Sequence, residues 1–245
     1  MVDLNIVQFL LFGVVVLATH FLEGITGFGC TALALPFGIM IVGIKLSVPT
    51  LIILAWILAL YIVIIDFKNI VWKEYIRIVT FVGIGLPIGM LIYSYLPETL
   101  LKKLLGGFMI LVALRGLYLS LGGTSKLKLN PIVLNIILFV GGIVHGAFGT
   151  GGPFIIIYAA NAIPKKSNFR ATLCTLWFTL NSIIIVKNFA SHAMTRNVFM
   201  LLLVSIPFLL AGMVLGNKAH NKVDDKLFTI LVYAVLLLSG IFMFL

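Results

Sequence analysis

The chain alternates between long apolar runs and short polar breaks. A helix that crosses a membrane needs about 20 mostly apolar residues, and this criterion marks ten segments. They lie at 4–22, 30–44, 47–65, 76–96, 99–121, 131–144, 152–164, 170–187, 197–216 and 226–245. The runs are apolar on every side and do not alternate with a period of two, so membrane strands are not expected. The pattern predicts an all-α polytopic membrane protein.

Two pairs of these segments are joined by glycine-rich turns, at 23–29 and at 145–151, and we expect all four paired segments to be short. Backbone leaves a helix inside a bilayer only where protein or a water-filled cavity surrounds it. Glycine permits the positive φ angles of such a break. The turns therefore indicate the broken helices of secondary transporters, whose half-helix N-termini point N–H groups at an anion. The alternative is that the glycines only allow close helix packing.

The two turns belong to a longer internal repeat with an offset of 122 residues. Residues 24–29 align with 146–151, and Thr50 aligns with Thr172. After one inserted residue, Gly89 and Lys103 align with Gly212 and Lys226. We therefore predict a first membrane repeat at 1–121, a linker at 122–130 and a second repeat at 131–245, each with a glycine-broken pair followed by three transmembrane helices.

The basic residues decide how the repeats are related. If each short pair forms a hairpin or crosses twice, each half makes an odd number of crossings and the second half is inverted. One side then collects eleven basic residues: Lys68, Lys73, Arg77, Lys126, Lys128, Lys165, Lys166, Arg170, Lys218, Lys222 and Lys226. The other collects five: Lys45, Lys102, Lys103, Lys187 and Arg196. Single crossings would split them nine against seven, so the positive-inside rule favours inverted repeats with both termini outside.

Composition supports the membrane assignment. Of the 245 residues 62% are hydrophobic and 10% are charged, and the mean hydropathy is +1.24, whereas soluble domains are about 45–50% apolar. This composition excludes a water-soluble enzyme or nucleic-acid-binding domain. We therefore expect the residues behind the net charge of +10 to lie mostly in loops that face lipid headgroups. The N-terminus has no signal-peptide pattern, and Cys30 and Cys174 imply no disulfide framework.

The candidate substrate-binding residues come from the two turns and from the eighth segment. In the turns they are Thr26, Gly27, Gly29, Gly149, Thr150, Gly151 and Gly152, with a helix starting near Pro153 that leaves the N–H groups of Gly151 and Gly152 exposed. In the eighth segment Thr172 and Thr175 belong to a polar stripe with Asn168, Thr179 and Ser182, and Asn181 lies beside it. The stripe either lines an anion path or forms hydrogen bonds with neighbouring helices. Arg170 either holds the anion or is a loop cation.

Ionisable residues inside the apolar runs are candidates for proton coupling. Glu23 and His145 occupy equivalent positions in the repeats, and a carboxylate–imidazole pair can carry a proton. Alternatively, Glu23 lies at the water interface or pairs with His20, and His145 satisfies a backbone group of the broken helix. Arg115 either snorkels to the surface or serves as a counter-charge for a passing anion.

The turns also carry a family resemblance. Gly27-Phe28-Gly29 followed by Pro36, and Gly149-Thr150-Gly151-Gly152-Pro153 followed by Tyr158, resemble the two signature turns of the TauE/SafE sulfite and organosulfonate exporter family. The resemblance covers essentially the whole chain. It implies a secondary transporter, usually an exporter, of small sulfur-containing anions such as sulfite or sulfoacetate. The first turn departs from the family pattern because Cys30 stands where a further glycine is common, so we expect more substrate contacts on the second turn.

The expected function is therefore secondary transport of a small sulfur anion across the plasma membrane by alternating access. The sequence has no Walker motif for ATP and neither a Gly-x-Ser-x-Gly elbow nor a His-Glu-x-x-His motif, so an enzyme is not expected. We expect no cofactor, no metal and no nucleic-acid partner. The expected partners are the anion and the lipid bilayer. Whether the chain forms a homo-oligomer stays an open question. The alternative functions are an anion channel or a membrane accessory subunit.

Overall fold

The chain is described by a computed structural model that covers residues 4–26, 29–123 and 130–219. Of the C-terminal segment it covers residues 230, 233–234, 236–238, 240–241 and 243–244. Every regular element within these residues is a helix, which confirms the predicted all-α class. The elements are α1 Ile6–Thr26, α2 Cys30–Val42, α3 Ile44–Asp66, η1 Phe67–Asn69, α4 Trp72–Tyr95, α5 Glu98–Ser120, α6 Pro131–Phe148, α7 Gly152–Ala162, α8 Lys166–Ala190 and α9 Arg196–Ala219.

Six of these helices are long and apolar enough to cross a membrane, as predicted for a polytopic protein: α1, α3, α4, α6, α8 and α9. The expectation that all four paired segments are short is wrong for two of them. α1 has 21 residues and α6 has 18, because both helices continue into the glycine motifs, while α2 and α7 have only 13 and 11. Half of the predicted tenth segment, 226–245, lies outside the described residues, as do positions 124–129 of the predicted linker.

Glycine and proline mark the ends of the short helices. Gly29 precedes α2 with φ +98°, and Gly43 separates α2 from α3 with φ +81°. α6 starts at Pro131, where the Asn130 side chain accepts the Ile132 N–H at 3.0 Å, and ends at Gly149 with φ +69°. These φ values lie in the left-handed region, which glycine adopts without a steric penalty.

Each short helix folds back beside the helix before it. Gln8 near the start of α1 donates its Nε2–H to the Ile41 carbonyl near the end of α2 at 2.9 Å, so α1 and α2 form an antiparallel hairpin. α7 likewise packs on α6. The hairpin arrangement is the one that gives each half an odd number of crossings.

Long-range packing joins the two halves of the chain. α1 lies along α9, α6 lies along α4, and α3 lies along α8. Glycines allow the closest approaches: Gly89 of α4 faces the backbone of α6, and Gly212 of α9 faces the backbone of α1 at Leu17. Small residues at such crossings let membrane helices pack closely.

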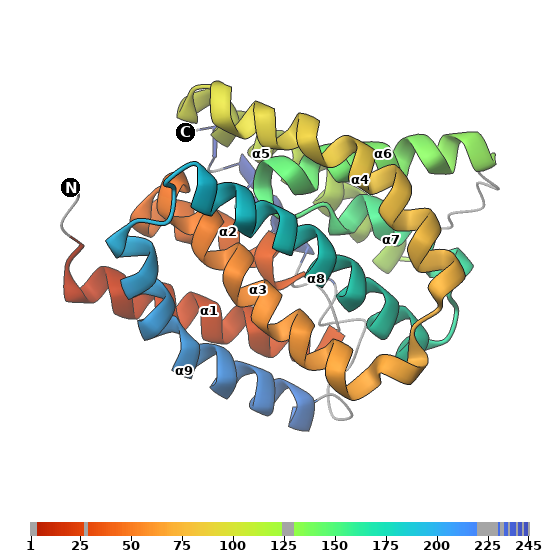
Figure 1. Cartoon of the computed structure of the whole chain (residues 1–245), viewed down its shortest axis with the longest axis horizontal. Coiled ribbons are helices and arrows are strands. Elements are labelled where there is room, and N and C mark those ends of the chain that lie inside the picture. The colour runs from red at the N-terminus through yellow and green to blue at the C-terminus, as the bar shows by residue number, and fades with distance from the viewer. Residues whose placement is uncertain are drawn as a thin grey trace.

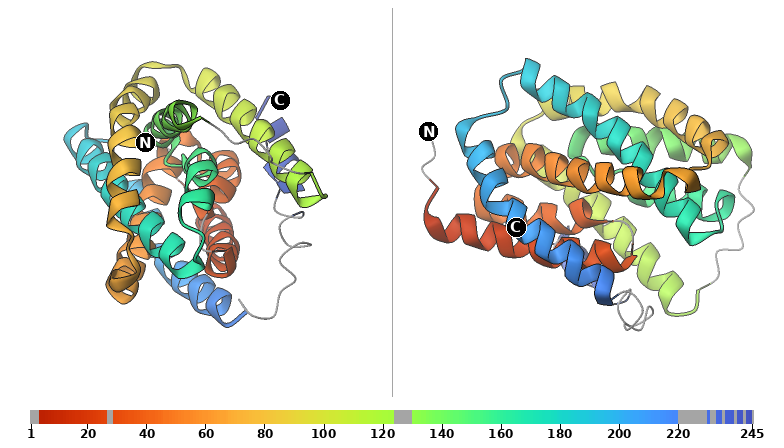
Figure 2. Two further views of the ribbon diagram at one scale, coloured as in Figure 1. Left: turned by 90° about the vertical axis from the view of Figure 1, so that its right-hand side faces the viewer. Right: turned by 60° about the horizontal axis from the view of Figure 1, so that its bottom comes forward.

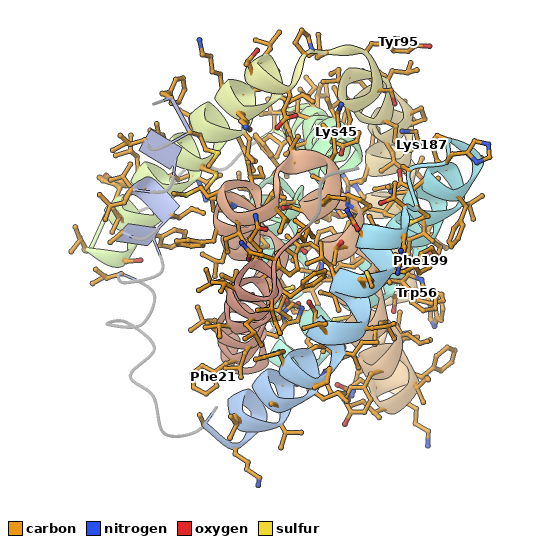
Figure 3. The ribbon with its side chains drawn as sticks, turned by 90° about the vertical axis from the view of Figure 1, so that its left-hand side faces the viewer. Phe21, Lys45, Trp56, Tyr95, Lys187 and Phe199 are labelled. Atoms are coloured by element: carbon orange, nitrogen blue, oxygen red, sulfur yellow. The ribbon has the colours of Figure 1, made fainter. Side chains whose placement is uncertain are left out.

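The helices share two ends, at the left and right of Figure 1. The right-hand end, here called the η1 end, contains η1 and the starts of α4, α6 and α8; there Val71 donates its N–H to Thr172 Oγ1 at 2.9 Å. The opposite end, here called the α1 end, contains the start of α1 and the last turns of α4 and α8; there Lys187 Nζ donates to Ser94 Oγ at 2.8 Å. Figure 3 looks onto the α1 end and labels Lys45, Tyr95 and Lys187.

Candidate functional site

The two glycine turns meet at one cavity. The cavity has a volume of about 250 Å³ and is lined by residues of both turns, of both short helices and of α1, α3, α5, α6 and α8. Figure 2 (left) looks along the helix axes and shows α5 on one side of the molecule with α3 and α4 on the other. Lining residues from the two turns include Gly29, Cys30, Gly149, Thr150 and Gly152.

In the first turn, Glu23 is bonded to the start of the short helix. Its Oε2 accepts the backbone N–H of Cys30 at 3.0 Å, and the side chain is buried. A carboxylate at a helix N-terminus satisfies a backbone donor and interacts favourably with the helix dipole. Glu23 therefore stabilises the first turn from the end of α1. Gly27 lies outside the described residues, as does the side chain of Thr26.

In the second turn, His145 has the corresponding position. The backbone N–H of Gly151 donates to His145 Nδ1 at 3.3 Å, and His145 Nε2 lies 3.0 Å from Asn181 Oδ1. Because a backbone N–H can only donate, Nδ1 is the unprotonated nitrogen and Nε2–H donates to Asn181. The ring stacks on Trp177 with centroids 5.2 Å apart. The fold therefore holds one tautomer of neutral His145 beside the cavity.

The two ionisable residues thus contact the backbone of their own turns. Within the described residues no hydrogen bond joins Glu23 to His145, although both line the cavity. His20 is not bonded to Glu23 there: its Nδ1 lies 2.7 Å from the Val16 carbonyl, and its buried Nε2 has no partner in that part of the chain. A proton relay between Glu23 and His145 stays a prediction.

Two backbone donors of the second turn are without an acceptor in the part of the chain that the structure describes. The N–H of Gly151 is bonded to His145, and that of Gly149 to the His145 carbonyl at 2.7 Å. The N–H groups of Thr150 and Gly152 have no hydrogen-bond acceptor within the described residues, and both residues line the cavity. α7 begins at Gly152, one residue before Pro153. The second turn therefore presents two donors at a helix N-terminus, the arrangement that binds anions elsewhere.

The candidates from α8 lie away from the cavity lining. Thr172 accepts the Val71 N–H, and Thr175 donates its hydroxyl to the Ala171 carbonyl at 2.8 Å. Arg170 is partly buried with its Nε unpartnered within the described residues, and it also lies outside the lining. Their part in substrate binding stays a prediction.

The rest of the polar stripe on α8 bonds neighbouring helices. Thr179 Oγ1 lies 2.8 Å from Tyr75 Oη, and Trp56 donates its Nε1–H to Ser182 Oγ at 2.8 Å. Both contacts join α8 to another helix, to α4 and to α3. These hydroxyls form hydrogen bonds between helices, which is one of the two roles that the sequence left open.

Two further residues shape the site: the sequence placed Asn181 only beside the polar stripe, and it did not indicate Trp177. Asn181 orients His145, and Trp177 stacks on the same ring; both line the cavity. They stand four residues apart on α8, so they share a helix face. An amide one turn from a tryptophan in an apolar helix is the signal that could have indicated their shared role.

Comparison with known proteins identifies one matching family. The family model described as sulfite exporter TauE/SafE matches residues 11–243. No curated protein and no solved structure matches the chain.

Proposed function

This chain belongs to the sulfite exporter TauE/SafE family, and from that premise we propose that it exports sulfite or a small organosulfonate such as sulfoacetate. Members of the family are membrane transporters and not enzymes, so the chain is a multi-pass transporter of the cell membrane. The choice between sulfur anions and the export direction belong to the proposal.

The observation that carries the proposal is the shared cavity of the two glycine turns. An oxyanion in this cavity would accept hydrogen bonds from the N–H groups of Thr150 and Gly152. The positive end of the α7 dipole would favour its charge. The first turn would contribute from Gly29 on the opposite repeat, where the Cys30 N–H is bonded to Glu23 as the Gly151 N–H is bonded to His145. That the second turn holds more of the substrate stays a prediction from the sequence.

We further propose that proton binding at the turns couples to transport. Protonation of His145 at Nδ1 would remove the acceptor of the Gly151 N–H and place a positive charge beside the anion. Protonation of Glu23 would weaken its bond to the Cys30 N–H. A proton would therefore change the donors that each turn offers, which links its movement to that of the anion.

Flux into reconstituted liposomes tests the proposal. We expect saturable uptake of sulfite and sulfoacetate, but not of acetate, and faster uptake when a pH gradient is imposed. Glu23→Gln keeps an oxygen that accepts the Cys30 N–H and removes the charge, so it should retain sulfite exchange at equal pH and lose the acceleration by the gradient.

Each possible result tests a different part of the proposal. Absence of sulfur-anion flux in the wild-type protein under every gradient would contradict the substrate assignment. Flux that does not saturate would favour an anion channel. If Glu23→Gln keeps the full gradient response, Glu23 does not carry the coupling proton.

A further inference from the structure

Arg115 of α5 lines the cavity of the glycine turns, far from them in sequence. We infer that Arg115 binds the substrate anion at the mouth of this cavity and determines the apparent affinity for it. This role rests on the proposed function of sulfur-anion transport, since it assigns a further residue to the same site.

The geometry of α5 places Arg115 at the cavity. Phe108, Leu111, Val112 and Arg115 all line it, and their spacing of i, i+3, i+4 and i+7 forms one stripe of a helix. Arg115 is exposed, so it stands where the cavity opens and not at its closed interior. α5 runs from the α1 end to the η1 end, and Arg115 lies in its last two turns, toward the η1 end.

The charge of Arg115 is uncompensated in the described part of the chain. No hydrogen bond or ion pair of its guanidinium occurs there, and the one ion pair joins Lys102 to Glu98 at 3.2 Å. Among the described residues that line the cavity, Arg115 is the sole lysine or arginine, and Glu23 is the sole aspartate or glutamate. An arginine inside an apolar helix is costly unless it reaches water or a counter-charge.

The chemistry of the guanidinium fits the proposed substrate. Its planar fork of N–H donors binds two oxygens of one oxyanion at once, which sulfite and sulfonates both present. Deeper in the cavity, Phe108 of the same stripe stacks on Phe154 of α7, with ring centroids 5.4 Å apart. Phe154 follows the N–H donor of Gly152 by two residues. The anion would thus pass from Arg115, beside the aromatic pair, to the donors of the second turn.

Transport kinetics in phosphatidylcholine liposomes test this assignment. We expect Arg115→Gln to raise the KM for sulfite about tenfold or more, the effect of one lost charge-assisted bond, with little change in kcat. Arg115→Lys should restore part of the affinity. Added salt should raise the KM of the wild-type protein and change that of Arg115→Gln less. Arg196→Gln, which removes the same charge at an exposed position of the α1 end, is the matched control and should keep the wild-type KM.

The outcomes distinguish the two hypotheses. If the wild-type protein carries no sulfur anion, the proposed function fails. If it carries sulfite and Arg115→Gln has the same KM, the role of Arg115 fails alone. An effect of Arg115→Gln that appears only with anionic lipid in the liposomes would assign Arg115 to lipid headgroups and overturn the inference.

Discussion

Two adjacent glycines of the second turn differ in their surroundings. A Cβ at Gly151 would overlap the Gly141 carbonyl oxygen and lie 2.8 Å from His145 Cβ, whereas a Cβ at Gly152 would meet only the Trp177 ring, at 3.8 Å. The backbone of α6 cannot move away from Gly151 without separating α6 from α7. The absence of a side chain is thus required at Gly151 and not at Gly152.

We therefore predict that Gly151→Ala abolishes sulfite uptake and that Gly152→Ala retains most of it. The added methyl group at Gly151 would displace His145 from the turn, and overpacking of this kind costs about 1–3 kcal/mol. Liposome flux of both variants, normalised to the amount of folded protein, measures the difference. Equal activity of the two variants would contradict the packing seen at this turn.

At the scale of residues, the sequence related Glu23 to His145 but did not predict their contacts. The offset of 122 residues paired Glu23 with His145, and both prove to accept a backbone N–H of their own turns. Neither bond could be derived from spacing, because it depends on how the chain reverses after the helix. The contact of Thr172 was equally unpredictable, because its hydroxyl accepts the N–H of Val71, which is 101 residues away in the sequence.

At the scale of elements, the crossing of α4 and α6 depends on glycines from both helices. A Cβ at Gly89 would overlap the Ile143 carbonyl oxygen and lie 2.8 Å from Ala147 N, and a Cβ at Gly146 would overlap the Leu86 carbonyl oxygen. Gly83, on the same helix as Gly89, has no atom within 4 Å of an added Cβ. Close contact of this kind supplies packing that lipid cannot replace.

Replacing these glycines by alanine should separate two effects of an added methyl group: the clash with a neighbouring helix and the gain in helix propensity. We predict that Gly89→Ala lowers the melting temperature in detergent and that Gly83→Ala leaves it unchanged or raises it slightly, since alanine favours a helix more than glycine does. Thermal unfolding followed by size exclusion measures both. A melting temperature of Gly89→Ala at or above that of Gly83→Ala would contradict the close crossing.

The positions of the helices were predictable from hydropathy, while two of the helix ends were not. Gly24 and Gly146 suggested that α1 and α6 stop before them, yet α1 continues to Thr26 and α6 to Phe148. Gly146 stays helical because its missing side chain admits the backbone of α4, and the helix ends only at Gly149, where φ becomes positive. A glycine in a membrane segment can mark a close contact with another helix or the end of its own helix. The sequence alone does not distinguish the two.

At the scale of the whole molecule, the packing pairs correspond when the two halves are exchanged. α1 lies on α9 as α6 lies on α4, and α3 lies on its counterpart α8. Trp56 and Phe178, which are 122 residues apart, stack with centroids separated by 5.4 Å. Equivalent residues of two repeats touch only near the axis that relates them. These contacts support our proposal that the halves are inverted repeats about an axis between α3 and α8.

An inverted arrangement also predicts the orientation in the membrane. Apart from Arg115 within α5, seven basic residues of the described chain lie toward the η1 end: Lys68, Lys73, Arg77, Lys165, Lys166, Arg170 and Lys218. Five lie toward the α1 end: Lys45, Lys102, Lys103, Lys187 and Arg196. Four further basic residues that the sequence assigns to the η1 end fall outside the described residues. By the positive-inside rule, we therefore expect the η1 end to face the cytoplasm.

Single cysteines at exposed positions test this orientation. We expect a membrane-impermeant maleimide to label Lys103→Cys on intact cells and to label Lys73→Cys only after the membrane is opened. Background labelling should be low, because Cys30 and Cys174 are 3% and 1% exposed. The reverse pattern would place the η1 end outside the cell, and the opening beside Arg115 would then receive anions from outside. Labelling at both positions on intact cells would contradict a single orientation. The predicted pattern instead places that opening toward the cytoplasm, where an exporter collects its substrate.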